Sequence, residues 1–295
     1  MSDSIAGLRR RIDSAADLQS VVRTMRALAA SAIGQYERAV AALVDYDRAV
    51  ALGLGVCLRA AETGPAARAS PARGALAVVF GSDQGLVGQF NDVVVEHAID
   101  RLATAGSGPS VWVIGERAAA RLADAGLDVV GVYPVPPTVD AIDLLVGRLQ
   151  VDIETRSSQA ARPPLFVFHN RPLPGALYEP SERRLLPLDA VWLAAAARTP
   201  WPTGNLPEIV GDAAAMLRAL VREYLFISLY RACAESLASE NASRLAAMQR
   251  ADRSIAETLD TLHATFDRLR QAAIDAELFD VTAGYESLAS PPGAA

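Results

Sequence analysis

Residues 81–91, with the sequence Gly-Ser-Asp-Gln-Gly-Leu-Val-Gly-Gln-Phe-Asn, are the first candidates for chemistry in this chain of 295 residues. They follow an apolar run at 75–80 and precede a helical pattern, which is the context in which α/β folds bind phosphates. The glycine spacing, however, matches neither GxGxxG nor GxxxxGK[ST]. The segment therefore predicts a tight glycine turn with Asn91 as the helix cap, in preference to a phosphate cradle.

The three histidines, His97, His169 and His263, are the next candidates, for acid–base or metal chemistry. Neither HxxxH nor HExxH spacing occurs, so no metal site is predicted. His263 follows an apolar heptad position, which is typical of an interface histidine. His169 ends an apolar strand pattern, and an enzyme would use either His169 or Asp83. No serine or cysteine partner is identifiable, so we predict no catalytic residue and no cofactor.

The composition excludes several classes of function. All 28 basic residues are arginine, so no Walker-type lysine and no Schiff base are available. A net charge of −6 argues against nucleic-acid binding. No run of 18 apolar residues exists, which argues against membrane insertion, and no signal peptide is evident. Cys57 and Cys233 lie in helical patterns and are predicted to be reduced core residues of a cytosolic protein.

The prolines divide the chain into segments. All seventeen lie between Pro65 and Pro207 or at Pro291 and Pro292. We therefore predict an N-terminal arm at 1–64, a middle domain at 65–207, a C-terminal arm at 208–290 and a tail at 291–295. The middle domain is predicted to have strands at 75–80, 111–114, 128–135 and 165–169, helices at 92–105, 116–125 and 138–155, and extended chain at 177–188 around a charged turn at 179–184. This alternation predicts a small, mostly parallel, Rossmann-like sheet covered by helices.

Both arms carry a heptad pattern of apolar and small residues, which keeps one face of a helix toward a partner. We predict one helix at about residues 4–58, capped by Ser2, Asp3 or Ser4 and bent or weakened at Gly53 and Gly55. The first pattern is Ile5, Leu8, Ile12, Ala15, Leu18, Val22, Met25, Ala29, Ala32, Tyr36, Ala39, Leu43, Tyr46 and Val50. The second is Ala238, Asn241, Leu245, Met248, Asp252, Ile255, Leu259, Leu262, Phe266, Leu269 and Ala273. Two such arms predict a long antiparallel two-helix coiled coil.

Charged residues accompany the second pattern and allow two interpretations. They form either a solvated helix face with i,i+4 pairs or a polar track that touches surrounding subunits. Asn241 and Asp252 at heptad positions favour the track. From residues alone, the chain is an α/β head on a helical rod, suited to coupling or spacing. The alternative is an α/β enzyme with a helical dimerisation arm.

Three stretches carry a resemblance to a known family. They are residues 11–14 with 24–31 (Arg-Ile-Asp-Ser and Thr-Met-Arg-Ala-Leu-Ala-Ala-Ser), the glycine segment 82–88, and residues 228–248 with 268–274. In this order and at these separations they resemble the gamma subunit of F-type ATP synthases. Residues 275–284 depart from the family pattern, as do Ala16, Ser20 and Ala32, where lysine is common. These departures indicate a divergent bacterial form.

The resemblance implies a rotor with no catalysis of its own. The coiled coil would lie inside a ring of three alpha and three beta subunits, and the head would sit on the membrane c ring beside the epsilon subunit. Arg270 and Gln271 would contact a beta subunit, and Met25 would lie in the turning seam. The location implied is the cytoplasmic face of the bacterial inner membrane, as a peripheral protein. Because the first arm is shorter than the second, the C-terminal tip is expected to be a single helix surrounded by other subunits.

Overall fold

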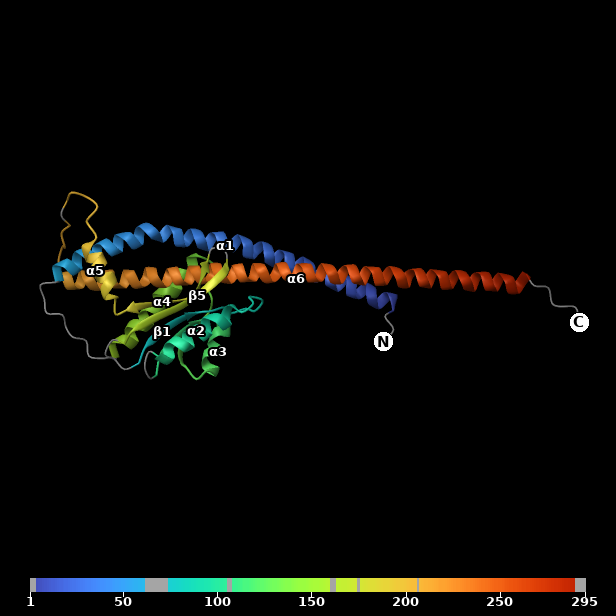
Figure 1. The fold of residues 1–295 in the computed structure, drawn as a ribbon, viewed down its shortest axis with the longest axis horizontal. Coiled ribbons are helices and arrows are strands. Elements are labelled where there is room, and N and C mark those ends of the chain that lie inside the picture. The colour runs from blue at the N-terminus through green and yellow to red at the C-terminus, as the bar shows by residue number, and fades with distance from the viewer. Residues whose placement is uncertain are drawn as a thin grey trace, which may run out of the picture. The chain divides into compact units, whose positions relative to one another are not determined.

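Two long helices, α1 (Ile5–Ala61) and α6 (Ala213–Ala289), form the arms that the heptad patterns predicted (Figure 1). The computed structural model describes residues 4–61, 74–104, 108–159, 163–173, 176–205 and 207–289. The chain divides into two units, residues 29–244 and residues 1–28 with 245–295. The predicted tail at 291–295 lies outside the described residues.

Local hydrogen bonds explain where the two arm helices begin. The Gly7 amide donates to Ser4 Oγ at 3.1 Å, so Ser4 caps α1 as predicted. At α6, the amides of Ala214 and Ala215 donate to the Asp212 carboxylate at 3.0 Å each. Gly211 has φ +89°, which is incompatible with a helix, so α6 starts five residues later than the predicted arm at 208.

The arms are antiparallel in each unit. In the unit of residues 29–244, Asp47 of α1 pairs with Arg231 of α6 at 2.8 Å. In the other unit, Arg23 and Arg26 both contact the Asp252 carboxylate, at 3.2 and 2.8 Å. A charged residue is therefore tolerated at this heptad position of α6, because Arg23 and Arg26 of α1 supply the opposite charge to Asp252.

The seam on α1 departs from the predicted pattern at three positions. Ile5, in the first turn, is 36% exposed, Leu18 is 54% exposed and Tyr46 is 45% exposed, so these three predictions were wrong. Gln19 and Asp47 are the half-buried residues next to Leu18 and Tyr46. The regular rotation of the helix places Gln19 and Asp47 on its half-buried face. Their apolar neighbours Leu18 and Tyr46 are left on the surface.

A five-stranded sheet forms the middle of the chain, in the order β3-β2-β1-β4-β5. The strands are β1 (Leu76–Phe80), β2 (Ser110–Ile114), β3 (Asp128–Tyr133), β4 (Leu165–Leu173) and β5 (Ala176–Leu186). The first four are parallel, as predicted, and β5 is antiparallel to β4. The predicted charged turn at 179–184 is wrong, because these residues pair with β4 as part of an edge strand. Charged side chains are common on edge strands, where they discourage aggregation.

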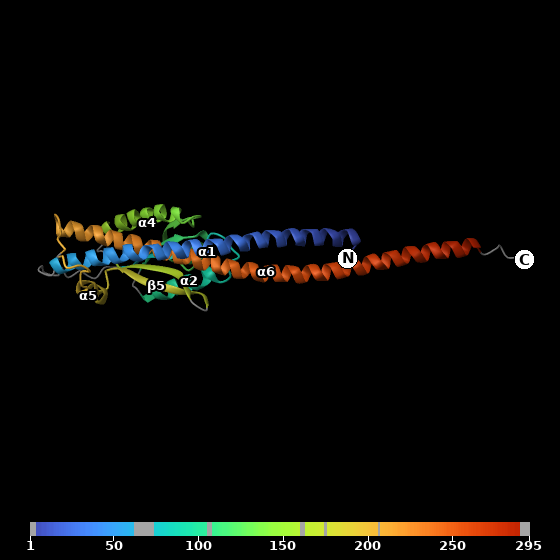
Figure 2. The same ribbon diagram turned by 90° about the horizontal axis from the view of Figure 1, so that it is seen from above.

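Helices cover both faces of this sheet. One face packs against α2 (Phe90–Thr104) and α3 (Glu116–Asp124), and the other packs against α4 (Asp140–Gln159) and residues of α1 and α6. Alternate residues of β1 serve the two faces, with Val78 on the α6 side and Val79 on the α2 side. Figure 2 shows α4 beside α6, where the Gln150 side chain donates to the Arg222 carbonyl at 2.8 Å. A further helix, α5 (Ala190–Arg198), was not predicted.

Candidate functional site

The glycine-rich segment closes on itself instead of forming an anion site. The Ser82 amide donates to Asn91 Oδ1 at 2.9 Å, and Asn91 Nδ2 donates to Ser82 Oγ at 2.8 Å. Asn91 is buried inside α2, so its prediction as a helix cap was wrong: its side chain holds the preceding loop. A Cβ on Gly81 would collide with the Ala118 side chain, so this position must be glycine for α3 to pack closely.

Asp83 is fully engaged by backbone donors. Its carboxylate accepts the Glu116 amide at 3.0 Å and the Val135 amide at 2.8 Å. The Glu116 amide is the first of α3, which is the group that a phosphate would use at a helix N-terminus. Asp83 therefore takes the place of an anionic ligand and joins the loop ends after β1, β2 and β3. Its contacts give it a structural role.

The same segment attaches the head to α6. Ser243 Oγ donates to the Val87 carbonyl, in a buried hydrogen bond between residues 156 positions apart. Gly88 has φ +59° at this point, and a Cβ there would lie 3.6 Å from Ser243 Oγ. We call Ser243 and residues 81–89 the latch. The sequence offered no signal for it except the run of small residues around Ser243.

His169 makes a second connection between the head and α6. Its Nε2 lies 2.7 Å from Glu235 Oε2, and its side chain is 7% exposed. The next residue, Asn170, is completely buried and donates from Nδ2 to the Phe90 carbonyl at 2.8 Å. The pair contains no nucleophile. It ties β4 to α6, as Asn170 ties β4 to α2.

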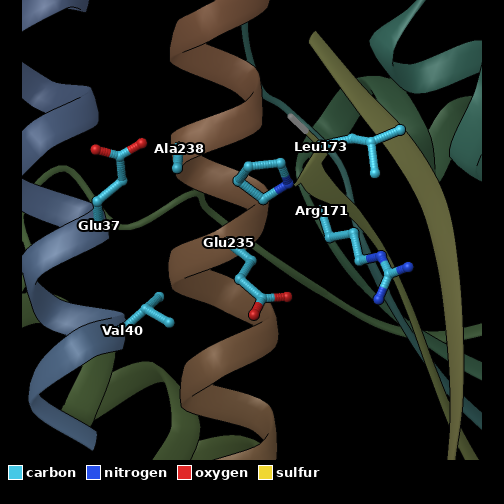
Figure 3. A pocket seen from close by; sticks show the side chains of 7 residues that line it. Glu37, Val40, Arg171, Leu173, Glu235 and Ala238 are labelled. Atoms are coloured by element: carbon cyan, nitrogen blue, oxygen red, sulfur yellow. The ribbon is translucent and has the colours of Figure 1, made fainter. Parts of the chain in front are cut away.

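A groove of about 480 Å³ lies beside this connection. Figure 3 shows side chains from three elements around it: Glu37 and Val40 of α1, Glu235 and Ala238 of α6, and Arg171 and Leu173 of β4. Two of its three charged groups are paired within the chain, since Arg171 pairs with Glu179 and Glu235 contacts His169, and the third, Glu37, is exposed. The groove therefore lacks the convergent, unpaired groups that an active site requires.

One turn beyond Glu235, α6 carries a buried ion pair. Glu240 and Arg244 are one helical turn apart, with Oε1 and Nη2 at 2.6 Å. Burial raises the pKa of Glu240, and the Arg244 guanidinium opposes that rise. The pair lies next to the latch residue Ser243, in the part of α6 to which the head is attached.

The three residues predicted to contact a beta subunit do not form one cluster. Met25 is half-buried in α1, near the Arg26–Asp252 pair. Arg270 and Gln271 lie on the far part of α6, about 27 Å along the helix from Asp252 at 1.5 Å per residue. Arg270 is exposed, and Gln271 Nε2 donates to Asp275 Oδ1 at 3.1 Å.

The end of α6 is uncovered by the rest of its unit. Every residue from 271 to 285 is exposed. The apolar members are bare: Leu278 is 63% exposed, Phe279 is 73% exposed and Tyr285 is 75% exposed. We call residues 271–285 the tip. Exposed apolar residues in such numbers mark a binding surface more often than a free one.

The described residues offer little support for other kinds of site. They contain no group of three or more His, Cys, Asp or Glu side chains that would hold a metal ion. None of the helices in the described part of the chain is both long and apolar enough to cross a membrane.

Comparison with known proteins agrees with this picture. The family model described as ATP synthase matches residues 4–288, which is almost all of the chain. The chain belongs to the ATP synthase gamma family.

Relatives in the gamma family match over almost their full length. The ATP synthase gamma chain of Moorella thermoacetica is 27% identical over 289 residues, covering 95% of this chain and 98% of the relative. That of Frankia casuarinae is 28% identical over 301 residues, covering 98% and 99%. A gamma chain is a non-catalytic stalk subunit, so the comparisons favour the stalk over the alternative of an α/β enzyme.

Solved structures share the fold of this gamma-family chain. A chain in the OSCP/F1/c-ring structure of the Euglena gracilis mitochondrial ATP synthase has a TM-score of 0.63 at 12% identity, covering 99% of this chain and 98% of its own length. A chain in the central stalk/c-ring structure of the Tetrahymena thermophila enzyme has a TM-score of 0.55 at 18% identity, covering 78% and 99%. These similarities confirm the predicted α/β head with two helical arms.

Proposed function

We propose that this chain is the rotor of an F-type ATP synthase, coupling ion flow through a membrane c ring to ATP synthesis or hydrolysis at the beta subunits. Its arms turn inside a ring of three alpha and three beta subunits. Its head rests on the c ring, beside the epsilon subunit, at the cytoplasmic face of a bacterial inner membrane. The observation that carries this proposal is the exposed apolar tip at residues 271–285.

The exposed apolar side chains of the tip favour a surrounding ring of subunits. Burying a large apolar side chain is worth about 1.5–3 kcal/mol, and at least three such side chains are bare on the tip. A surrounding ring of subunits would cover them on all sides. Gly284 and Ala283 keep part of the tip narrow, which suits a surface that slides past successive partners.

Arg270 and Gln271 are proposed to meet a beta subunit, and Met25 is proposed to lie in the turning seam. Arg270 is exposed and offers a fork of donors for carboxylate or carbonyl oxygens. Gln271 is the next residue on the exposed helix. Met25 is unbranched and adaptable, which suits a contact that changes during rotation.

Transmission of torque requires that the two arm helices be held together, and ion pairs between them do this. The Asp47–Arg231 pair and the Asp252 contacts with Arg23 and Arg26 each join α1 to α6. Such links oppose sliding of one helix along the other. The latch and the His169–Glu235 contact fix the head to α6, so rotation of the head would turn the helix with it.

A reconstituted complex tests the proposal. The chain is co-expressed with its alpha, beta, epsilon and membrane subunits, and ATP hydrolysis and ATP-driven ion pumping are measured in vesicles. Arg270→Ala is expected to lower both activities, whereas Arg268→Ala, an exposed arginine on the other side of the helix, is the matched control. Removal of residues 271–289 is expected to reduce pumping more than hydrolysis. A chain that does not co-purify with alpha and beta subunits overturns the proposal.

A further inference from the structure

The outer face of α4 has a second apolar stripe that the fold does not use. The inner face is buried in the core through Ile142, Val146 and Leu149. On the outer face, Leu144 is 61% exposed and Val151 is 62% exposed. Gly147 lies between them, and a Cβ there would meet nothing within 4 Å.

These positions form a shallow groove of about 480 Å³ along two turns of α4. Leu144, Gly147 and Val151 recur at steps of three and four, which is the spacing of a helix–helix seam. The gap at Gly147 accepts a side chain from a facing helix, as a hole accepts a knob. The groove is lined by Tyr133, Asp143, Leu144, Gly147, Arg148, Val151 and Asp152.

The charges on the rim indicate the character of the partner. Asp143 and Asp152 stand on the groove against the single arginine Arg148. The Tyr133 hydroxyl donates to the Asp152 carboxylate. Burial and that carboxylate raise the pKa of Tyr133 to about 12, so it remains a neutral donor that holds Asp152 in place. A basic partner complements this rim better than an acidic one.

We propose that the outer face of α4 is a docking surface for a basic amphipathic helix of a neighbouring subunit. The helix places an apolar residue over Gly147, between Leu144 and Val151, and its basic flanks face Asp143 and Asp152. Six of the seven lining residues belong to α4, so a facing helix makes more contact here than an added strand beside β3. This inference rests on the proposed function, because it requires that the chain be held among other subunits.

A single exposed thiol tests the surface. Both native cysteines, Cys57 and Cys233, are buried, so Gly147→Cys adds one reactive group to the groove. Maleimide labelling is timed on the free chain and on the purified complex. We expect the rate at residue 147 to fall about tenfold on assembly. Ala123→Cys, an exposed position on α3 across the sheet, is the control and should change little.

A benzophenone-maleimide probe on the same cysteine then identifies the partner. Cross-linking in the purified complex to a helical segment rich in lysine or arginine supports the inference. Cross-linking to a strand, to an acidic segment or to a second copy of this chain overturns it. An unchanged labelling rate at residue 147 in a complex that contains this chain also overturns it, and leaves the proposed function intact. Failure of the chain to enter the complex instead counts against the proposed function.

Discussion

Gly55 of α1 gives a test of how closely the helices pack around the head. A Cβ at Gly55 would lie 3.1 Å from the Ala196 carbonyl carbon in α5, and still closer to its oxygen. A Cβ at Gly53, two residues earlier, would lie 3.2 Å from the ends of the Leu220 side chain. The first neighbour is backbone and is held by its helix, whereas the second is a flexible side chain. Gly55→Ala and Gly53→Ala therefore form a matched pair.

The two substitutions gain the same helix propensity but differ in the free energy that overpacking costs. Each gains about 1 kcal/mol from replacing glycine by alanine inside a helix. Overpacking costs about 1–3 kcal/mol, and a rigid carbonyl contact belongs at the upper end of that range. We expect Gly55→Ala to lower the free energy of unfolding by about 2 kcal/mol, whereas Gly53→Ala changes it by less than about 1 kcal/mol in either direction.

Urea denaturation of the isolated chain measures the difference. Far-UV circular dichroism follows the helices, and tryptophan fluorescence follows the middle of the chain, where Trp112 is buried in β2 and Trp192 of α5 packs on Tyr224 with ring centroids 5.1 Å apart. Gly147→Ala on the open face of α4 serves as a control that should stabilise the chain. Equal unfolding midpoints for the Gly55 and Gly53 variants would refute the close approach of α1 to α5.

Three further predictions concern the latch, the buried ion pair and the division of the chain. Ser243→Ala is expected to cost about 1 kcal/mol in urea denaturation, because one buried hydrogen bond is lost while the Val87 carbonyl keeps the Phe90 amide as a donor. Ser239→Ala, whose buried hydroxyl has no partner among the described residues, should cost less. Because burial raises the pKa of Glu240 above 4.5, the folded state binds the extra proton, and wild-type stability should fall as pH rises from the unfolded to the folded pKa. Glu240→Gln should lack that fall; parallel pH profiles of the two unfolding midpoints would contradict it. Residues 29–244 should fold alone and resist proteolysis, whereas residues 65–207, the predicted middle domain, should not, because the core includes side chains of both arms.

The arms and the order of the sheet were predictable because their signals are local and repeated. A heptad pattern or an alternation of strands and helices survives a few wrong positions, so the errors at Leu18 and Tyr46 did not disturb the fold. The sequence pattern preferred the apolar residue, but the helix rotation places its neighbour in the seam. The boundaries at 64, 207 and 290 remain predictions.

The polar contacts of the head were not predictable, because they join distant parts of the chain. Asn91 looked like a cap, since caps and turns use the same residue type. Its actual partner, Ser82, lies nine residues earlier, and the latch joins residues 156 positions apart. The charged residues at 179–184 resembled a turn, because an edge strand with one solvated face has a composition similar to that of a turn. The contacts proposed for Arg270, Gln271 and Met25 are with other chains, so they remain proposals.

One of the two units is assembled from segments that the ribosome makes at very different times. Residues 1–28 emerge early, yet their companions, residues 245–289, are among the last to be synthesised. At about 5–20 residues per second, the roughly 200 intervening residues keep the first segment waiting for about 10–40 s. During that interval Leu8 and Val22, which are buried in the finished protein, lack their helical neighbour. The nascent N-terminal helix therefore exposes apolar residues of the kind that chaperones bind. Premature termination of synthesis leaves this unit without its second helix, the end of α6.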